Sequence, residues 1–110
     1  MPTNELARQQ VLLECKILDT KPEKAFDDIT RLAAYVCQAP IALVSLIDAE
    51  RQWFKSKVGL KASQTHRDLA FCAHAILQSK IFIVPDALDD DRFAHNPLVT
   101  SAPYIRFYAG

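Results

Sequence analysis

Apolar residues recur at helical spacing in the first sixteen positions of the chain. Leu6, Leu13 and Ile17, joined by Val11 and Leu12, predict a helix from Asn4 to about Lys16. Thr3 or Asn4 can cap its exposed amides.

A second helix is predicted after a sharper start signal. Thr20 and Glu23 have the spacing of a T-x-x-E capping box, with Pro22 early in the first turn. The pattern that follows is typical of an amphipathic helix ended by Ala39 and Pro40. Its apolar positions are Phe26, Ile29, Leu32, Ala33, Val36 and Cys37, and Asp27, Asp28 and Arg31 fall on the other side.

The period then changes to that of strands. Residues 41–48 form a short run rich in Ile, Leu and Val, and residues 53–60 alternate, so the two segments together predict an antiparallel hairpin. A third helix is predicted over residues 68–80, with Thr65 and Asp68 as its capping arrangement.

The last third of the chain is punctuated by prolines. Residues 81–87 predict a third strand, 87–93 a capped turn or short helix, 96–103 an irregular linker, and 104–110 a return to strand. Adjacent antiparallel strands with interspersed helices indicate the α+β class.

Composition narrows the classes of function. Half of the 110 residues are hydrophobic, which fits one globular domain over residues 1–110. The 13 basic and 13 acidic side chains balance, which argues against binding nucleic acid or anionic lipid through bulk charge. No apolar run approaches the roughly 20 residues of a membrane span, so a cytoplasmic protein is expected. With Gly59 and Gly110 as the two glycines, a glycine-rich phosphate loop is excluded.

Cys72 and His74 are the first candidates for chemistry, in the stretch LAFCAHAIL. Residues two apart on a helix point about 200 degrees away from each other, so a helix separates the thiol from the imidazole. On a strand they would share a face, but His66 and His95 lack a ligand-like spacing to them. We therefore predict no metal site and no catalytic residue, and interpret Cys72 as a small core residue. The cysteines, Cys15, Cys37 and Cys72, are widely spaced and fit reduced thiols.

The acidic residues of the second half of the chain, and the aromatic residues, can be explained without a calcium site or a ligand cavity. Asp86, Asp89, Asp90 and Asp91 lack the alternation, glycine and closing Glu of a calcium loop, and helix capping explains them better. Arg92, Asn96 and Arg106 can anchor the linker through backbone carbonyls. The aromatic residues are most simply core, although aromatics lining a cavity would look identical. They are Trp53, Phe54, Phe71, Phe82, Phe93, Phe107 and Tyr108.

Several segments, in order, resemble the GAF domain family. They are RQWFKS, FCAHAI, the D-x-R-F-x-x-N-P-L-V pattern and IRFYAG, within a likeness that covers nearly the whole chain. The subgroup is the one found at the sensory end of bacterial histidine kinases and cyclic-dinucleotide cyclases.

The resemblance implies a central antiparallel sheet with helices on one face, terminal helices that often form a dimer bundle, and a pocket on the other face. Carried over residue by residue, the ligand or cofactor pocket would draw on Phe71, Cys72, Ile76, Asp86, Arg92, Phe93 and Asn96. Family ligands range from cyclic nucleotides and bilins to haem and small metabolites, so the cofactor stays unknown.

What the resemblance implies is a non-enzymatic sensory module of a larger signalling protein, with a kinase or cyclase output domain downstream. Two alternatives remain open, a thiol-dependent enzyme that reduces free methionine sulfoxide and a purely structural dimerisation module. Ala73 stands directly after Cys72, where bilin-binding members commonly have His, so covalent chromophore attachment is not expected. The family continues past IRFYAG with further strands and a closing helix, so we expect a fragment or a partner chain that completes the sheet.

Overall fold

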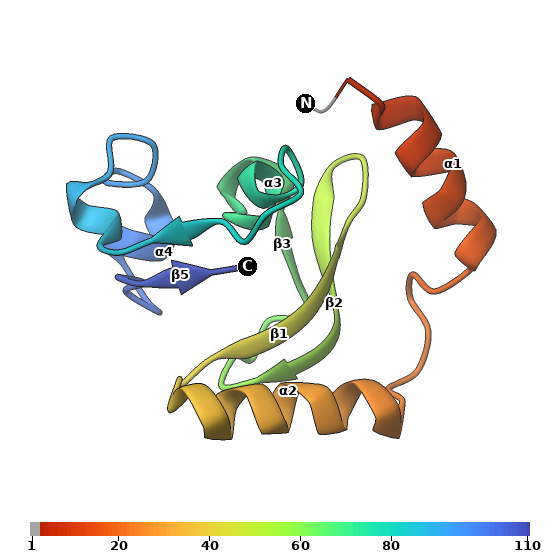
Figure 1. Cartoon of the computed structure of the whole chain (residues 1–110), viewed down its shortest axis with the longest axis horizontal. Helices are drawn as coiled ribbons and strands as arrows, with labels where there is room; N and C mark the ends of the chain where they lie inside the picture. Colours follow the sequence, from red (N-terminus) through yellow and green to blue (C-terminus); the bar gives the residue numbers. More distant parts are fainter. Residues whose placement is uncertain (1–2) are drawn as a thin grey trace. The chain divides into compact units, whose positions relative to one another are not determined.

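The computed structural model describes residues 3–110, which form two compact parts (Figure 1). Residues 3–67, the N-terminal unit, contain α1 (Glu5–Cys15), α2 (Lys24–Cys37), β1 (Ala42–Ile47), β2 (Arg51–Val58) and β3 (Gln64–His66). Residues 68–110, the C-terminal unit, contain α3 (Cys72–Ala75), β4 (Ile83–Val84), α4 (Pro97–Thr100) and β5 (Tyr108–Ala109). The 3₁₀ turns are η1 (Arg67–Leu69) and η2 (Ala87–Asp89). The architecture is α+β, as predicted.

Both N-terminal helices form where the sequence predicts them, but their caps differ. Asn4 stands at the N-cap of α1 without a side-chain hydrogen bond to the helix. The predicted Thr20–Glu23 capping box is wrong, because Glu23 is itself the N-cap residue of α2 and Pro22 lies before the helix. The physical reason is Lys55. Its ammonium group donates a hydrogen bond to the Thr20 hydroxyl at 2.7 Å and forms an ion pair with the Glu23 carboxylate at 2.6 Å.

The side of α2 that packs on the sheet is its polar side. Thr30 is buried, and the Ser56 hydroxyl on β2 lies 2.8 Å from its hydroxyl and donates to Asp27 Oδ1 at 2.5 Å. The amphipathic pattern favours the opposite packing, but the apolar side of the helix is exposed here. Its members Ile29, Leu32 and Val36 have 55%, 63% and 67% of their surface accessible.

The first sheet has the order β1-β2-β3 and is antiparallel throughout. The predicted hairpin is confirmed, with Leu46 opposite Trp53 and an irregularity between Val44 and Ser45. Strand β3 was not predicted, because its three residues, Gln-Thr-His, carry no apolar alternation. Thr65 pairs with Gln52 in this strand, so its predicted role as a helix cap is wrong.

The backbone at Gly59, directly after β2, lies very close to the backbone at Pro40. Gly59 has a φ of +79°, and a Cβ atom at this position would lie 1.8 Å from the carbonyl oxygen of Pro40. The residue after β2 therefore has to be glycine, since a side chain would strike the backbone that leads into β1.

The regular elements of the C-terminal unit are shorter than predicted. The third helix covers Cys72–Ala75 and not residues 68–80, and the predicted strands at 81–87 and 104–110 contract to β4 and β5, which pair antiparallel. Residues predicted as an irregular linker contain α4, capped by Asn96 with Pro97 in its first turn. The short elements enclose an apolar core of Phe71, Phe82, Val84, Ala87, Phe93 and Val99.

Within residues 3–110, no helix combines the length and the apolar character that crossing a membrane requires.

Candidate functional site

The predicted pocket residues all lie in the C-terminal unit, and several meet around one aromatic cluster. Phe71 precedes α3 and stacks on Phe93, with ring centroids 4.1 Å apart and an interplanar angle of 7°. Both rings are almost fully buried. Residues 22 positions apart in the sequence thus form the centre of the candidate site.

Cys72 is held against a residue that the pocket prediction omitted. Its sulfur lies 2.9 Å from the Tyr108 hydroxyl, and the Tyr108 ring is tilted against Phe71 at 5.2 Å. Burial, helped by the neighbouring Cys72 sulfur, raises the pKa of Tyr108 well above its ordinary value. The phenol therefore stays protonated and can donate a hydrogen bond within the cluster.

His74 packs on the same cluster from the other side of the short helix. Its ring meets Phe93 edge-on at 4.9 Å and lies 6.2 Å from Phe82. Burial, followed by the positive charge of Arg92, lowers the pKa of His74. The helical prediction is right for Cys72 and His74, which contact different partners.

The guanidinium group of Arg92 lies over the rings of Phe82 and Phe93 and is paired with the carboxylate of Asp90. Its guanidinium carbon is 4.9 Å from the Phe82 centroid and 5.4 Å from the Phe93 centroid. Asp90 accepts from Nε at 2.9 Å and from Nη2 at 2.6 Å. Arg92 was predicted to anchor the linker through backbone carbonyls, and these contacts show it anchored to Asp90 instead. A guanidinium fixed in this way can present donors to an anion without an entropic cost for ordering the side chain.

The remaining predicted residues make structural contacts. Asn96 caps α4 by accepting from the Leu98 amide and donates to the Leu69 carbonyl at 2.9 Å, as predicted for a carbonyl anchor. Asp86 accepts a hydrogen bond from the Leu88 amide at the start of η2, and this bond does not involve the stacked rings. Ile76 ends α3 and is half-buried. No observation tests whether these residues bind a ligand, so the pocket stays a prediction.

Sequence reasoning missed Tyr108, His74 and Asp90 as members of this cluster. Tyr108 was recognised as a core aromatic, His74 was considered as a partner of Cys72, and Asp90 was assigned to helix capping. The signal that could have placed Asp90 is its spacing of two residues from Arg92, which allows a local ion pair. Nothing in the spacing links Tyr108 to Cys72, because 36 residues separate them.

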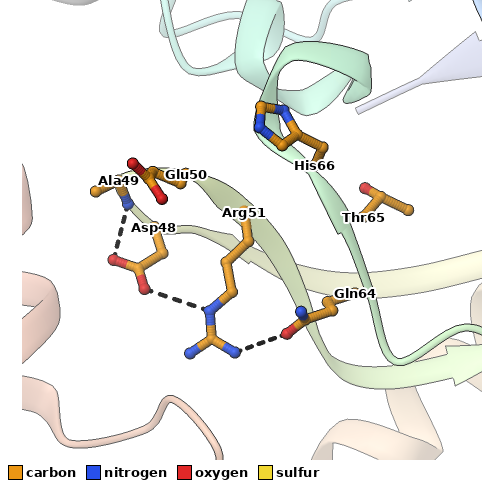
Figure 2. A pocket seen from close by; sticks show the side chains of 7 residues that line it. All are labelled: Asp48, Ala49, Glu50, Arg51, Gln64, Thr65 and His66. Carbon is orange, nitrogen blue, oxygen red and sulfur yellow. Dashed lines mark hydrogen bonds and ion pairs between the residues drawn. The ribbon is translucent and has the colours of Figure 1, made fainter.

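A hollow in the N-terminal unit was not predicted either (Figure 2). It has a volume of about 570 Å³ between the β1–β2 turn and β3. Figure 2 shows Arg51 held between Asp48 and Gln64, at 3.4 Å and 2.8 Å. Ala49, Glu50, Thr65 and His66 complete its lining. The hollow is open, and its Arg51 is paired with Asp48, so it shows polar surface without an evident reacting group.

Metal binding has no visible basis in the described part of the chain. Across residues 3–110, no three side chains of the His, Cys, Asp or Glu type come together in a way that could hold an ion. Cys15 and Cys37 are exposed at the ends of α1 and α2, and within residues 3–110 the three cysteines form no disulfide.

Comparison with known proteins decides the family. The family model described as GAF domain matches residues 21–110. The chain belongs to the GAF domain family. This GAF chain is also 43% identical, over 109 residues, to the cyclic di-GMP phosphodiesterase PA2567 of Pseudomonas aeruginosa. That alignment covers 99% of the chain and 19% of the relative, so the chain spans about a fifth of the length of this relative.

Proposed function

We propose that this GAF chain is a sensory or regulatory module of a bacterial signal-transduction protein and performs no chemistry itself. The observation that carries this proposal is the 43% identity, over almost the whole chain, to one fifth of a protein named as a cyclic di-GMP phosphodiesterase. We therefore favour an output domain that acts on cyclic dinucleotides, with a kinase output as the alternative. The module would work in the cytoplasm, where such nucleotides are found.

A small ligand, bound beside the aromatic cluster of the C-terminal unit, would supply the signal. Support comes from Arg92, whose guanidinium is oriented over Phe82 and Phe93 and so offers a charge next to apolar surface. Binding sites for small molecules commonly combine these two elements. A ligand that prefers one conformation of the module would shift the population of the other and so alter the output.

Thermal melting of the purified chain against a set of anionic metabolites, with cyclic di-GMP included, tests ligand binding. We expect at least one compound to raise Tm, and Arg92→Gln to abolish the rise. Arg31→Gln is the matched control, because Arg31 is an exposed residue of α2. The ligand should still raise Tm in this variant. A ligand effect that survives Arg92→Gln would place binding elsewhere, and no effect together with no co-purified mass in native mass spectrometry would favour a structural module.

The absence of chemistry is tested directly at Cys72. The chain is incubated with free methionine sulfoxide and a thiol reductant, and methionine is measured. We expect no turnover, since the Cys72 sulfur is engaged with Tyr108 and the other cysteines stand at helix ends. Turnover that disappears in Cys72→Ser would show that the module is an enzyme.

Homodimerisation through the helices is the second part of the proposal. Leu6 and Leu13 on α1 are 88% and 65% exposed, and the apolar side of α2 is open as well. Neighbouring exposed apolar side chains of this kind are typical of an interface. Sedimentation velocity should give a dimer that Leu32→Glu dissociates, whereas Arg31→Glu, at an exposed charged position of the same helix, should leave it intact.

A further inference from the structure

Helix α1 faces the rest of the N-terminal unit with its polar side. Glu5, Arg8, Gln9 and Leu12 recur at helical spacing and are buried or half-buried, and in the described chain Leu12 is the buried residue of α1. The apolar residues Leu6, Val11 and Leu13 point away and are largely exposed. This orientation is the reverse of what apolar burial favours, so polar contacts must hold the helix in place.

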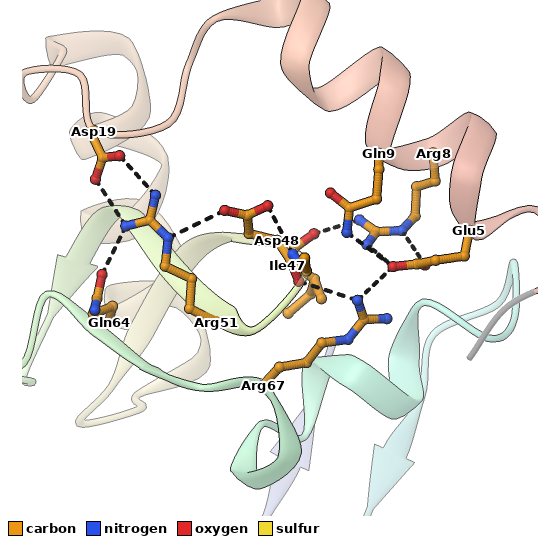
Figure 3. Close-up of polar contacts among 10 residues, drawn as sticks. Glu5, Arg8, Gln9, Asp19, Ile47, Asp48, Arg51, Gln64 and Arg67 are labelled. Carbon is orange, nitrogen blue, oxygen red and sulfur yellow. Dashed lines mark hydrogen bonds and ion pairs between the residues drawn. The ribbon is translucent and has the colours of Figure 1, made fainter.

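Those contacts converge on the end of β1 and on η1 (Figure 3). Glu5 Oε1 accepts from Arg67 Nη1 at 2.6 Å, and Arg8 Nη1 donates to the Ile47 carbonyl oxygen at 2.6 Å. Arg67 also donates to the Asp48 carbonyl oxygen at 3.2 Å. We call the contacts among Glu5, Arg8, Arg67 and these two carbonyl groups the latch.

The latch is ionic over the whole physiological pH range. Hydrogen bonds from Arg8, then from Arg67, hold the pKa of Glu5 far below its usual value. A change of pH within this range therefore does not weaken the attachment, and high ionic strength weakens it only in part, because the side chains of Arg67 and Glu5 are largely buried.

The connector between α1 and α2 has a separate and firmer anchor. Arg51 binds the Asp19 carboxylate through two bonds of 2.9 Å and 2.7 Å, and Figure 3 shows Asp48 between this pair and the latch. Lys55, whose side chain is fully buried, donates to Thr20 Oγ1 and the Lys21 carbonyl oxygen and pairs with Glu23. Residues 19–23 are thus fixed to β2 mainly through the buried ammonium group of Lys55, whereas the carboxylates of Asp19 and Glu23 are 66% and 60% exposed.

Between the latch and the anchor, the backbone has two unusual residues. Lys16 and Asp19 adopt left-handed φ values of 52° and 60°, although neither is glycine. Such positions bracket residues 17–18 and can absorb a change of chain direction with small rearrangements elsewhere.

We propose that α1 is a detachable arm, which the latch docks on the sheet and which pivots at residues 16–18 while the anchor keeps residues 19–23 in place. The arm leaves the sheet and returns without unfolding of the hairpin. It requires neither a ligand nor a second copy of the chain, so it stands independently of the proposed function.

The balance of interactions makes this opening accessible. Docking buries one leucine side chain of α1, so the attachment depends mainly on the polar contacts of the latch, in which the side chains of Arg67 and Glu5 are 7% and 15% exposed. An isolated helix of 11 residues is marginal in water, so α1 loses its helical hydrogen bonds once it leaves the sheet. Exchange of the amide hydrogens of residues 9–15 therefore reports undocking.

Hydrogen exchange with mass spectrometry tests the arm, at a concentration where sedimentation velocity shows one species. In the wild-type chain, residues 9–15 should exchange at least about tenfold faster than residues 52–57 of β2. Glu5→Gln and Arg67→Gln should each speed the exchange of residues 9–15 by about fivefold, and the double variant by no more than the stronger single one, because they break the same pair. Sodium chloride at high concentration should speed this exchange in the wild type to a smaller extent.

Exchange of residues 19–23 and 52–57 should stay unchanged in all these variants, which also shows that the variants remain folded. Lys24→Gln is the matched control, because its pair with Asp28 is exposed, and it should change no rate. Equal exchange of α1 and β2 in the wild type, with the same denaturant dependence, would overturn the proposal. So would equal acceleration of both segments by Glu5→Gln, since the latch would then stabilise the unit as a whole.

Discussion

Each of the two units is stabilised internally by a different kind of interaction. Within residues 3–110, the five buried polar side chains all belong to residues 3–67, and they are Thr30, Gln52, Lys55, Ser56 and Arg67. The buried residues of the C-terminal unit are apolar, with three stacked or tilted phenyl rings at the centre. Polar contacts are directional and fix one arrangement, whereas apolar packing depends on volume, so the two units should respond to different mutations.

Loss of volume should have its largest effect in the C-terminal unit. Phe93→Ala should lower the free energy of unfolding by about 3–5 kcal/mol, because a ring that contacts Phe71, Phe82 and His74 is removed from a packed core. Urea titration followed by circular dichroism measures the change. Phe107→Ala, at a residue 63% exposed, should cost less than about 1 kcal/mol, and equal costs would break the contrast.

Loss of one charge should be the next largest effect, in the N-terminal unit. Lys55→Met should lower the free energy of unfolding by about 2–3 kcal/mol, because Thr20 and the Lys21 carbonyl lose their charged donor although the apolar volume is kept. The same titration applies. Lys24→Met, where the lysine side chain is 86% exposed, should stay within about 0.5 kcal/mol, and a similar loss in both would show that burial of the ammonium group is irrelevant.

A smaller effect is expected where a polar residue supports the apolar unit. Asn96→Ala should cost about 1–2 kcal/mol, because it removes the cap of α4 and the donor to the Leu69 carbonyl. Asn4 also stands at an N-cap but makes no side-chain bond to its helix, so Asn4→Ala should leave the melting temperature almost unchanged. Equal shifts in Tm would mean that residue type, and not the observed bonds, determines the loss.

The smallest effect concerns pH. The pKa of His74 is lower in the folded chain than in the unfolded one, so the unfolded state takes up the proton first. The contribution of His74 to stability is thus constant above the unfolded pKa of about 6.5 and decreases as the pH falls below it. Urea midpoints at pH 7 and pH 5 should differ less in His74→Gln than in the wild type, and an equal difference in the two proteins would contradict this contribution of His74.

Prediction from the sequence succeeded where a hydrophobic pattern extends over several helical turns or over a whole strand, even though the apolar sides of α1 and α2 are exposed. The two N-terminal helices and the hairpin have long runs of apolar residues, and the ladder of β1 and β2 follows from them. Prediction failed for the face of α2, because Thr30 and Asp27 are drawn to Ser56 on a strand that is distant in sequence. It failed for the capping box because Lys55 competes for both side chains.

The C-terminal unit shows the opposite limitation. Its residue types were recognised as core, but strands of two residues and helices of four have no period to detect. The contact of Cys72 with Tyr108 and the position of Arg92 over two rings arise from tertiary packing. The candidate site was therefore predictable as a set of segments, and its geometry was not.

The close approach at Gly59 has a consequence for how this chain can vary. The backbone after β2 rests on the Pro40 carbonyl, so the connection from α2 to β1 and the exit from the hairpin form one matched junction. A single inserted residue on either side would separate the matched atoms, whereas the loop at residues 60–63 ends away from this contact. Length changes should accordingly be tolerated at residues 60–63 and rejected at residues 38–41.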